Sequence, residues 1–382
     1  MSRIDEPMEE PVNWSTLGGV CIKVSSGATP LTGRADYYEG GDVPWLRTAE
    51  VVWRDVYETE VKITEKAVRE TGAKWIPADC VIVAISGATA ARAAINKIPL
   101  TTNQHCCNLE IDPKQANYRY VFHWVTANYE KLKAFGRGAR SDLNARLIKN
   151  FPIPLPSLQK QREIVRVLDS FGSLQAELKA ELQARKSQYA FYRESLLTHG
   201  DDISKVALGD VLSMRAGKFI AASEISPIQT DKNLYPCYGG NGIRGYVAVP
   251  NHEGRYVLVG RQGAWSGNVR RVDGQFYATE HAVVVTVGED VDVDWAFHML
   301  TVMDLNQYVS RGAQPGLAVG TLNALEIPLP PLDAQKRAAG ILDKFDLLVN
   351  DSSVGIPAEL NARHKQYEYY RDRLLTFEEL AG

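Results

Sequence analysis

Two long stretches of the chain carry apolar residues at the spacing of an amphipathic helix. In the first, they step by three or four positions from Phe171 to Leu182 and again from Tyr189 to Leu196, with one irregular step near Leu182. Lys, Arg, Glu and Gln fill the other positions. This stripe predicts a helix over 158–198 with one buried face. Such a helix would be about 60 Å long at 1.5 Å per residue, so we expect it to need a partner.

A second stretch repeats this pattern nearer the C-terminus. With a shift of 174 residues, SLQKQREIVRVLDSF at 157–171 corresponds to PLDAQKRAAGILDKF at 331–345. After a four-residue insertion, ELQARKSQYAFYRESLLT at 181–198 matches ELNARHKQYEYYRDRLLT at 359–376. We therefore expect the two helices to pack as an antiparallel coiled coil with pseudo-two-fold symmetry. Two unrelated helical hairpins, each covering its own domain, are the alternative.

The second helix carries an interruption that the first lacks. SSVGIP at 352–357 contains Pro357, which removes a backbone donor, and Gly355, which weakens a helix. The sequence therefore predicts a break or a bend in the second helix at this point.

The tetrapeptide IPLP precedes both helices, at 153–156 and 327–330. Proline fixes φ and disfavours helix in the residue before it, so we expect the preceding strand or coil to end there. Ser157 is a favourable N-cap and predicts a helix start near Leu158. Because the register also continues upstream, over 137–156 and 311–330, the chain is interpreted as a tandem duplication.

Short β-rich runs separated by turn residues make up the remainder of each repeat. Examples are CVIVAIS at 80–86, YVLVG at 256–260 and HAVVVTV at 281–287. They predict an α+β fold class with two globular domains whose loops are irregular. The expected organisation is a flexible tail over 1–11, a first domain over 12–151, a helical spacer over 152–200, a second domain over 201–326 and a second spacer over 327–382.

Composition narrows the class of protein. No run of about 18 apolar residues exists, which argues against a membrane span. The acidic start lacks the apolar region of a secretory signal. Five cysteines without CxxC spacing indicate reduced thiols and a cytoplasmic location. The net charge of −3 argues mildly against nucleic-acid binding, unless basic loops are masked by acidic helices.

No segment has a convincing catalytic pattern. GGNGIRG at 239–245 is not a phosphate-binding loop of the GxxxxGK[ST] type, and a recognition loop is the better interpretation. The residues from Asp55 to Lys62 have the types of a nuclease site, but a solvated charged face is favoured. His105 and His281 recur at corresponding places without a visible catalytic partner. We expect a protein that is not an enzyme and has no metal site.

Two copies of a variable domain, an IPLP turn and a long helix resemble the specificity subunit of type I restriction-modification enzymes. The motifs IPLPSLQKQREIVRVLD and IPLPPLDAQKRAAGILD, each with a tyrosine-rich helix downstream, carry the resemblance. It implies two target-recognition domains, each reading one half of a bipartite asymmetric double-stranded DNA target. The helices would set the gap and dock two modification subunits, and restriction subunits would join the full complex. S-adenosylmethionine, ATP and Mg would be bound by those partners, and this chain would hold no cofactor.

Base reading needs Arg, Asn or Gln donors aimed into a groove, while Lys, Ser and Thr fix phosphates. The DNA-binding residues expected in the first domain are Arg34, Tyr37, Tyr38, Arg47, Thr48, Ser86, Thr89, Arg92, Asn103, Gln104 and Arg137. Those expected in the second domain are Lys218, Tyr238, Asn241, Arg244, Arg261, Gln262, Trp265, Ser266, Asn268 and Arg311. Two alternatives remain at this point: a nuclease or methyltransferase with an unrecognised active site, and a coiled-coil scaffold that binds proteins.

Overall fold

A computed structural model describes residues 12–136, 143–198, 203–263, 265–310 and 316–377. The chain forms two compact units. Unit 1 comprises residues 1–177 and 361–382, and unit 2 comprises residues 178–360. The predicted tail over 1–11 lies outside the described residues.

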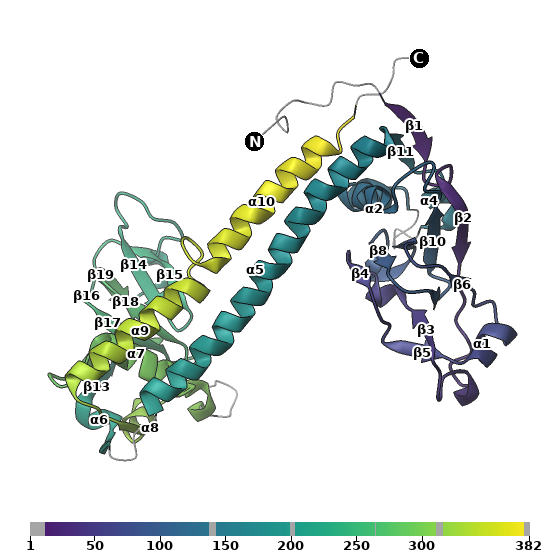
Figure 1. Ribbon diagram of the computed structural model, residues 1–382. Coiled ribbons are helices and arrows are strands. Elements are labelled where there is room, and N and C mark those ends of the chain that lie inside the picture. Colours follow the sequence, from purple (N-terminus) through teal and green to yellow (C-terminus); the bar gives the residue numbers. More distant parts are fainter. Residues whose placement is uncertain (1–11, 137–142, 199–202, 264, 311–315, 378–382) are drawn as a thin grey trace. The chain divides into compact units, whose positions relative to one another are not determined.

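Unit 1 contains the first globular domain (Figure 1). Its strands are β1 (Asn13–Thr16), β2 (Cys21–Ser26), β3 (Val43–Leu46), β4 (Asp55–Val56), β5 (Val61–Ile63), β6 (Trp75–Ile76), β7 (Val81–Ala84), β8 (Ala93–Asn96), β9 (Leu100–Thr102), β10 (Cys106–Ile111) and β11 (Pro152–Leu155). Its helices are α1 (Glu65–Glu70), α2 (Tyr118–Ala127), α3 (Tyr129–Ala134), α4 (Ala145–Lys149) and the start of α5 (Leu158–Thr198), with short 3₁₀ turns η1 (Ala35–Tyr37), η2 (Thr48–Glu50) and η3 (Gly87–Thr89).

Unit 2 contains the second globular domain. Its strands are β12 (Lys205–Ala207), β13 (Leu212–Ala216), β14 (Tyr235–Gly239), β15 (Gly242–Val247), β16 (His252–Glu253), β17 (Tyr256–Gly260), β18 (Val269–Val272), β19 (Gln275–Ala278), β20 (Ala282–Val287) and β21 (Glu326–Pro328). Its helices are α6 (Leu208–Val211), α7 (Val293–Val302), α8 (Val319–Asn323), α9 (Leu332–Asn350) and the start of α10 (Ile356–Leu374), with 3₁₀ turns η4 (Ala222–Glu224) and η5 (Leu305–Tyr308).

The two domains repeat the same sheet topology, except that β4 adds a fifth strand to one sheet of the first domain. The first has sheets of order β2-β10-β7-β8-β4, β5-β3-β9-β6 and β1-β11. The second has β13-β20-β17-β18, β15-β14-β19-β16 and β12-β21. Each core lies between the first of these sheets and a helix, α2 or α7, and Tyr120 and Trp295 on these helices are fully buried. The predicted α+β class and the tandem duplication are therefore confirmed.

The strand that precedes each long helix runs into IPLP and ends within it, at Leu155 in β11 and at Pro328 in β21, so the prediction that the preceding strand ends at this segment is confirmed. β11 pairs antiparallel with β1, placing Trp14 opposite Pro154, and β21 pairs with β12, placing Lys205 opposite Pro328. Each of these sheets has two strands and therefore leaves an edge where a missing N–H costs no ladder bond. Prolines are tolerated on such edge strands, and the helix begins directly after them.

The helix boundaries agree with the sequence. α5 begins at Leu158, and Ser157 Oγ accepts a hydrogen bond from Lys160 N (3.2 Å), as an N-cap should. The second repeat is interrupted between Asn350, where α9 ends, and Ile356, where α10 begins. The predicted break at SSVGIP is confirmed.

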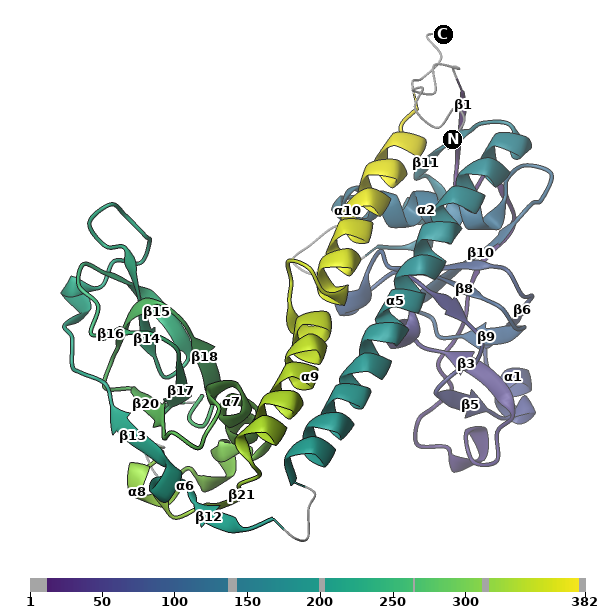
Figure 2. The same ribbon diagram turned by 60° about the vertical axis from the view of Figure 1, so that its left-hand side comes forward.

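Within unit 1, the two repeats supply one antiparallel helix pair. Phe171 stacks on Tyr370 (ring centroids 5.4 Å apart), while Gln175 Nε2 donates to the carbonyl oxygen of Arg363 (3.4 Å). Gln175 follows Phe171 along α5, whereas its partner Arg363 precedes Tyr370 along α10. The two helices therefore run in opposite directions, as both views show (Figures 1 and 2).

Unit 2 holds the reciprocal helix pair. Phe345 on α9 stacks on Tyr189 (6.1 Å) and Tyr192 (5.4 Å) of α5. We call residues 158–177 and 332–350 the proximal helices, and residues 181–198 and 359–376 the distal segments. Each unit therefore pairs its own proximal helix with the distal segment of the other repeat. Two independent hairpins, the alternative considered from the sequence, are ruled out by this exchange.

Candidate nucleic-acid interface

Strand order brings several loops of the first domain to one edge of its sheets. The ends of β2 and β7 lie beside the start of β10, because these neighbours are antiparallel. In the adjoining sheet β3 and β9 run parallel, and Asn103 N donates to Leu46 O (3.0 Å) just beyond their ends. We call the resulting group of loops the first loop edge. It comprises residues 27–30, 47–50, 85–92 and 103–105.

The second domain has an equivalent group. The ends of β13 and β17 lie beside the start of β20, β14 and β19 run parallel, and Thr279 N donates to Tyr238 O (2.9 Å). We call it the second loop edge. It comprises residues 217–221, 239–244, 261–263, 265–268 and 279–281.

Backbone contacts within the two loop edges correspond as well. Ile85 N donates to His105 O and Arg261 N donates to His281 O, at 2.9 Å in both domains. This contact ties the loop after one central strand to the turn before the next. The duplication therefore extends from the sheets to the loops that they carry.

Close backbone approach at the edge requires glycine in both domains. A Cβ on Gly27 would overlap the carbonyl oxygen of Thr102, and a Cβ on Gly217 would overlap that of Ala278. In both places the residue after glycine donates its N–H to the same carbonyl. Larger residues would force the loops of the edge apart.

The first loop edge brings together most of the residues predicted for that domain. They are Arg47, Thr48, Ser86, Thr89, Arg92, Asn103 and Gln104. The Arg92 guanidinium lies 4.6 Å from the centroid of the Trp53 ring and makes no ion pair with any residue that the structure describes. Arg47, in contrast, pairs with Glu60 (2.7 Å). Asn103 is largely buried, and its Oδ1 accepts from His105 N (3.1 Å).

Three other predicted residues lie at or beside η1, which packs against α1, and of these Tyr38 contacts the first loop edge through Pro30. Arg34 is engaged by both carboxylate oxygens of Asp36, and this contact together with Lys66 holds the pKa of Asp36 below its usual range. Tyr37 is only 5% exposed and donates to Glu70, while Tyr38 donates to the Pro30 carbonyl. Their polar groups are thus occupied within the domain.

The second loop edge gathers most of the residues predicted for its domain. They are Lys218, Asn241, Arg244, Arg261, Gln262, Trp265, Ser266 and Asn268, while Tyr238 lies just outside this edge, in β14, and its ring packs against Phe276. The three cations form no ion pair within the part of the chain that the structure describes. Trp265 is 58% exposed, whereas Ser266 is 1% exposed and donates to Gly263 O (2.8 Å). Arg137 and Arg311 lie outside the described residues.

Four residues at or beside the loop edges were not nominated from the sequence: Trp53, His105, Arg270 and His281. Arg270 is exposed on β18, makes no ion pair with a described residue, and lies against the turn at Gly242. The two histidines could have been predicted from the sequence, because they recur at corresponding positions of the two repeats. The position of Trp53 beneath Arg92 could not, because the two lie on separate segments joined only by folding.

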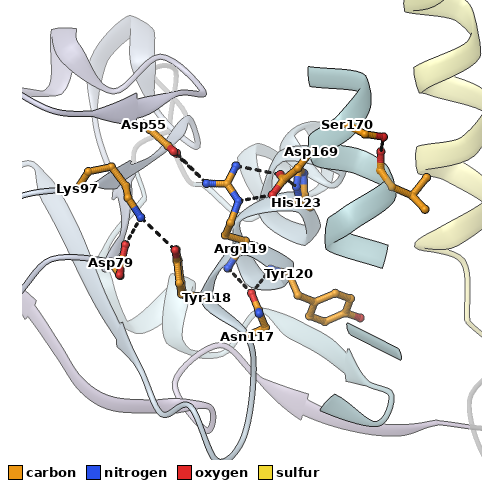
Figure 3. A network of polar contacts seen from close by, with 11 residues as sticks. Asp55, Asp79, Lys97, Asn117, Tyr118, Arg119, Tyr120, His123, Asp169 and Ser170 are labelled. Atoms are coloured by element: carbon orange, nitrogen blue, oxygen red, sulfur yellow. Dashed lines mark hydrogen bonds and ion pairs between the residues drawn. The ribbon is translucent and has the colours of Figure 1, made fainter. Parts of the chain in front are cut away.

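A partly buried ion cluster joins the first domain to its proximal helix (Figure 3). Arg119 on α2 donates to Asp169 of α5 through Nε (2.6 Å) and Nη2 (2.9 Å), and through Nη1 to Asp55 (2.9 Å). His123 Nε2 lies 2.8 Å from the same Asp169 carboxylate. Burial raises the pKa of Asp169, but its hydrogen bonds from His123 and Arg119 outweigh this and lower the pKa below its usual range.

Asp55 therefore does not lie on a solvated face, as the sequence interpretation had it. Its carboxylate is half-buried and neutralised by Arg119, an arrangement that the sequence could not reveal because the partners are 64 positions apart.

An analogous cluster joins the second domain to α9. His298 Nε2 lies 2.9 Å from Asp343, and Arg271 Nη1 donates to Asp343 and to Asp294 (2.7 Å each). His298 and Asp343 correspond to His123 and Asp169, but the arginine comes from β18 instead of the domain's helix. Burial lowers the pKa of His298, and its bond to Asp343 offsets only part of this.

Buried glutamines fix the start of each proximal helix to its domain. Gln161 accepts from Asn117 N (2.8 Å) and donates to Pro156 O (2.9 Å). Gln335 accepts from Asp292 N (2.9 Å) and donates to Pro330 O (2.8 Å). Both side chains are fully buried and fully satisfied, so each helix leaves its domain in a defined direction.

The duplicated domains, the exchanged helices and the paired loop edges define a protein of the DNA-specificity class. The family model "Type I restriction modification DNA specificity domain" matches residues 9–185 and 200–362, and the chain belongs to this family. It is a specificity subunit of a type I restriction-modification enzyme, a non-catalytic DNA-recognition component with two recognition domains. This assignment excludes the DNA-modifying enzyme considered from the sequence.

Individual relatives agree with the family assignment. The chain is 41% identical to the Type I restriction enzyme EcoprrI specificity subunit of Escherichia coli, over 89% of this chain and 88% of that protein. It is 28% identical to the EcoR124I/EcoR124II specificity subunit of the same organism, over 70% and 72%.

Solved structures share the fold. An S subunit from M. genitalium superposes with a TM-score of 0.64 at 15% identity, covering 99% of this chain and 100% of that one. A chain from a type I system studied for complex assembly gives a TM-score of 0.62 at 14% identity, covering 97% and 98%. No helix in the described ranges is long and apolar enough to cross a membrane.

Proposed function

We propose that this chain directs a type I restriction-modification complex to a bipartite, asymmetric DNA sequence, with one half read at each loop edge. The observation that carries the proposal is the recurrence of the same edge in two domains whose loops differ. Arg92 at the first edge, and Lys218, Arg244 and Arg261 at the second, form no ion pairs with described residues. A protein with a net charge of −3 therefore keeps free cations where phosphate and base contacts would be made.

The same proposal assigns a role to the coiled coil and to each partner subunit of the complex. The coiled coil would set the gap between the half-sites and dock two modification subunits, which would bind S-adenosylmethionine. Restriction subunits would supply ATP- and Mg-dependent chemistry. The chain itself would hold no cofactor and would act in the cytoplasm.

Selection from a random pool of DNA duplexes tests this function. The full-length chain, prepared alone and with its co-expressed modification subunit, should enrich a sequence with two short fixed halves and a non-specific gap of constant length. Sequencing of methylated adenines in the host, before and after deletion of the gene, should give the same motif. Enrichment of a single continuous site, or no enrichment, would contradict the proposal.

A further inference from the structure

The turn before β10 and the turn before β20 each end in a histidine, His105 and His281, whose side chain contacts the neighbouring loop. His105 Nδ1 lies 2.8 Å from Ser86 Oγ, and His281 Nδ1 lies 2.6 Å from Gln262 Oε1. Ser86 and Gln262 follow β7 and β17 and lie on the loops that the proposed function places against DNA. The same ring nitrogen thus contacts the same loop in two domains whose loop sequences differ.

The second nitrogen of each ring is also engaged. His105 Nε2 lies 3.2 Å from Gln104 Nε2, and His281 Nε2 lies 3.1 Å from a carboxylate oxygen of Glu280. Gln104 in turn accepts from the Thr29 hydroxyl, on the loop after β2. At the first edge a single imidazole therefore links side chains of three loops. A rigid ring with two nitrogens at a fixed angle suits this bridging role.

Core packing does not account for these contacts. The His105 side chain is exposed and that of His281 is 39% exposed, so neither fills the interior of its domain. Exposed histidines add little to stability. What their bonds fix is the conformation of residues 85–92 at the first edge and of residues 261–263 at the second, on which the free arginines Arg92 and Arg261 lie.

We propose that His105 and His281 are positioning residues. They hold the loop that follows β7 in the first recognition domain, and the loop that follows β17 in the second, in its DNA-binding conformation. The inference rests on the proposed function and adds a residue-level determinant to it. Each histidine acts on its own loop, so each should govern one half of the target only. This half-site selectivity separates positioning from a general effect on folding.

The test repeats the duplex selection with full-length His105→Leu and His281→Leu. We expect His105→Leu to relax base preference in one half-site and to weaken binding of the wild-type target about tenfold. His281→Leu should do the same to the other half. His105→Asn, which keeps an amide near the Nδ1 position, should recover most of the discrimination. His364→Leu, at an exposed histidine on α10, is the matched control and should change neither half.

A double-mutant cycle with Ser86→Ala guards against misfolding as the explanation. If His105 acts through Ser86, the double variant should lose no more affinity than the more affected single variant. Additive losses, equal relaxation of both half-sites, or unchanged preferences in both histidine variants would overturn the inference. Should the wild-type chain enrich no bipartite sequence, the proposed function itself would fail, which is a distinguishable result.

Discussion

At the first loop edge, strained backbone conformations fix the position of the Arg92 side chain. Two non-glycine residues that lie next to Arg92 adopt the left-handed region. They are Ala91, its neighbour in the sequence, with a φ of 69°, and Trp53, whose ring contacts its guanidinium, with a φ of 58°. Such conformations cost about 1–3 kcal/mol and persist only where surrounding contacts impose them. Here Trp53 N donates to Ala93 O and Ala91 N to Ala84 O, at 2.8 Å each. The strained backbone holds the Trp53 ring beneath the Arg92 guanidinium.

Removing the Trp53 ring should release Arg92. Trp53→Ala keeps a non-glycine residue at the strained position and removes two ring contacts, the edge-to-face contact with Tyr129 (centroids 5.6 Å apart) and the cation–π contact with Arg92, of which the latter contributes about 0.5–2 kcal/mol. We expect affinity for the target to fall about two- to thirtyfold, with relaxed preference in the half-site of the first domain. Fluorescence anisotropy on duplexes varied in one half at a time measures this. Trp53→Phe retains a ring and should retain most of the binding; equal losses in both variants would refute a stacking role.

Arg261 offers the corresponding test in the second domain. If its guanidinium makes a bidentate contact with guanine, Arg261→Ala should cost about 1–3 kcal/mol and relax one base of the second half-site. Binding titrations against the four single-base variants decide this. A uniform loss on all duplexes with a shallower salt dependence would identify a phosphate contact instead. Unchanged binding would remove Arg261 from the interface.

For individual residues, the sequence predicted which side chains lie on loops better than it predicted their burial and hydrogen bonds. It predicted that Arg92 and Arg261 lie on loops, because glycine-rich turns between β-runs are recognisable, and their contact with DNA stays a prediction. It also nominated Tyr37 and Ser266, whose polar groups are consumed by contacts inside the fold. Burial of one member of a loop depends on the path of the whole loop, and no local pattern encodes that path.

Secondary-structure elements are joined by the two ion clusters, which fix each recognition domain on its proximal helix. Asp169 and Asp343 correspond in the repeat, yet Arg119 and Arg271 reach them from different elements. The acid and the histidine therefore occupy corresponding positions in the two repeats, while the arginine does not. Such a difference is invisible to sequence alignment, although the helix boundaries and the break at 352–357 were readable from proline, glycine and the apolar stripe.

The second cluster should make unit 2 sensitive to acid. The pKa of His298 lies below its ordinary value of about 6.5 because burial disfavours the cation. Below about pH 6.5 the unfolded chain takes up a proton that the folded chain resists, so the free energy of unfolding falls as the pH falls. We expect the unfolding transition of unit 2 to move to lower temperature between pH 7 and pH 5 in differential scanning calorimetry.

Asp343 extends this dependence to lower pH. Burial raises its pKa, but bonds from Arg271 and His298 outweigh that and leave the pKa below its usual range. Its contribution is therefore present above about pH 4 and lost as the pH falls through the lowered value. His298→Asn should flatten the profile between pH 7 and pH 5 and leave the loss at lower pH. A variant that keeps the wild-type slope between pH 7 and pH 5 would show that His298 is not linked to folding, and the absence of any loss at lower pH in both proteins would show the same for Asp343.

On the scale of the whole molecule, each compact unit is assembled from both repeats. The distal segment of the first repeat packs against Phe345, and that of the second packs against Phe171. Tyr189 and Tyr192 correspond to Tyr367 and Tyr370 in the repeat, and both pairs contact a corresponding phenylalanine. The two distal segments are therefore chemically interchangeable. This exchange could be anticipated from the repeat, because a helix of 41 residues needs a partner and the nearest match is its own copy.

Interchangeable segments predict the behaviour of half the chain. A fragment of residues 1–198 keeps Phe171 but loses Tyr370, and it keeps Tyr189 and Tyr192 without Phe345. Two copies can restore both stacks if each distal segment packs on the proximal helix of the other copy. Stacked aromatic pairs contribute about 0.5–1.5 kcal/mol each beyond the apolar area they bury. We therefore expect the fragment to form a dimer, which analytical ultracentrifugation would measure, while the full chain stays monomeric.

Two aromatic substitutions separate this exchange from non-specific association of exposed apolar surface. Phe171→Ala in the fragment removes the ring on which the distal segment packs. It should raise the dimer dissociation constant about tenfold or more. Phe191→Ala removes a ring that is 66% exposed in the intact chain and should leave the dimer unchanged. A fragment that stays monomeric, or that associates equally well with either substitution, would show that the two distal segments are not equivalent. A dimer that forms as expected would carry two copies of the first loop edge, and should therefore select a palindromic DNA sequence built from the first half-site alone.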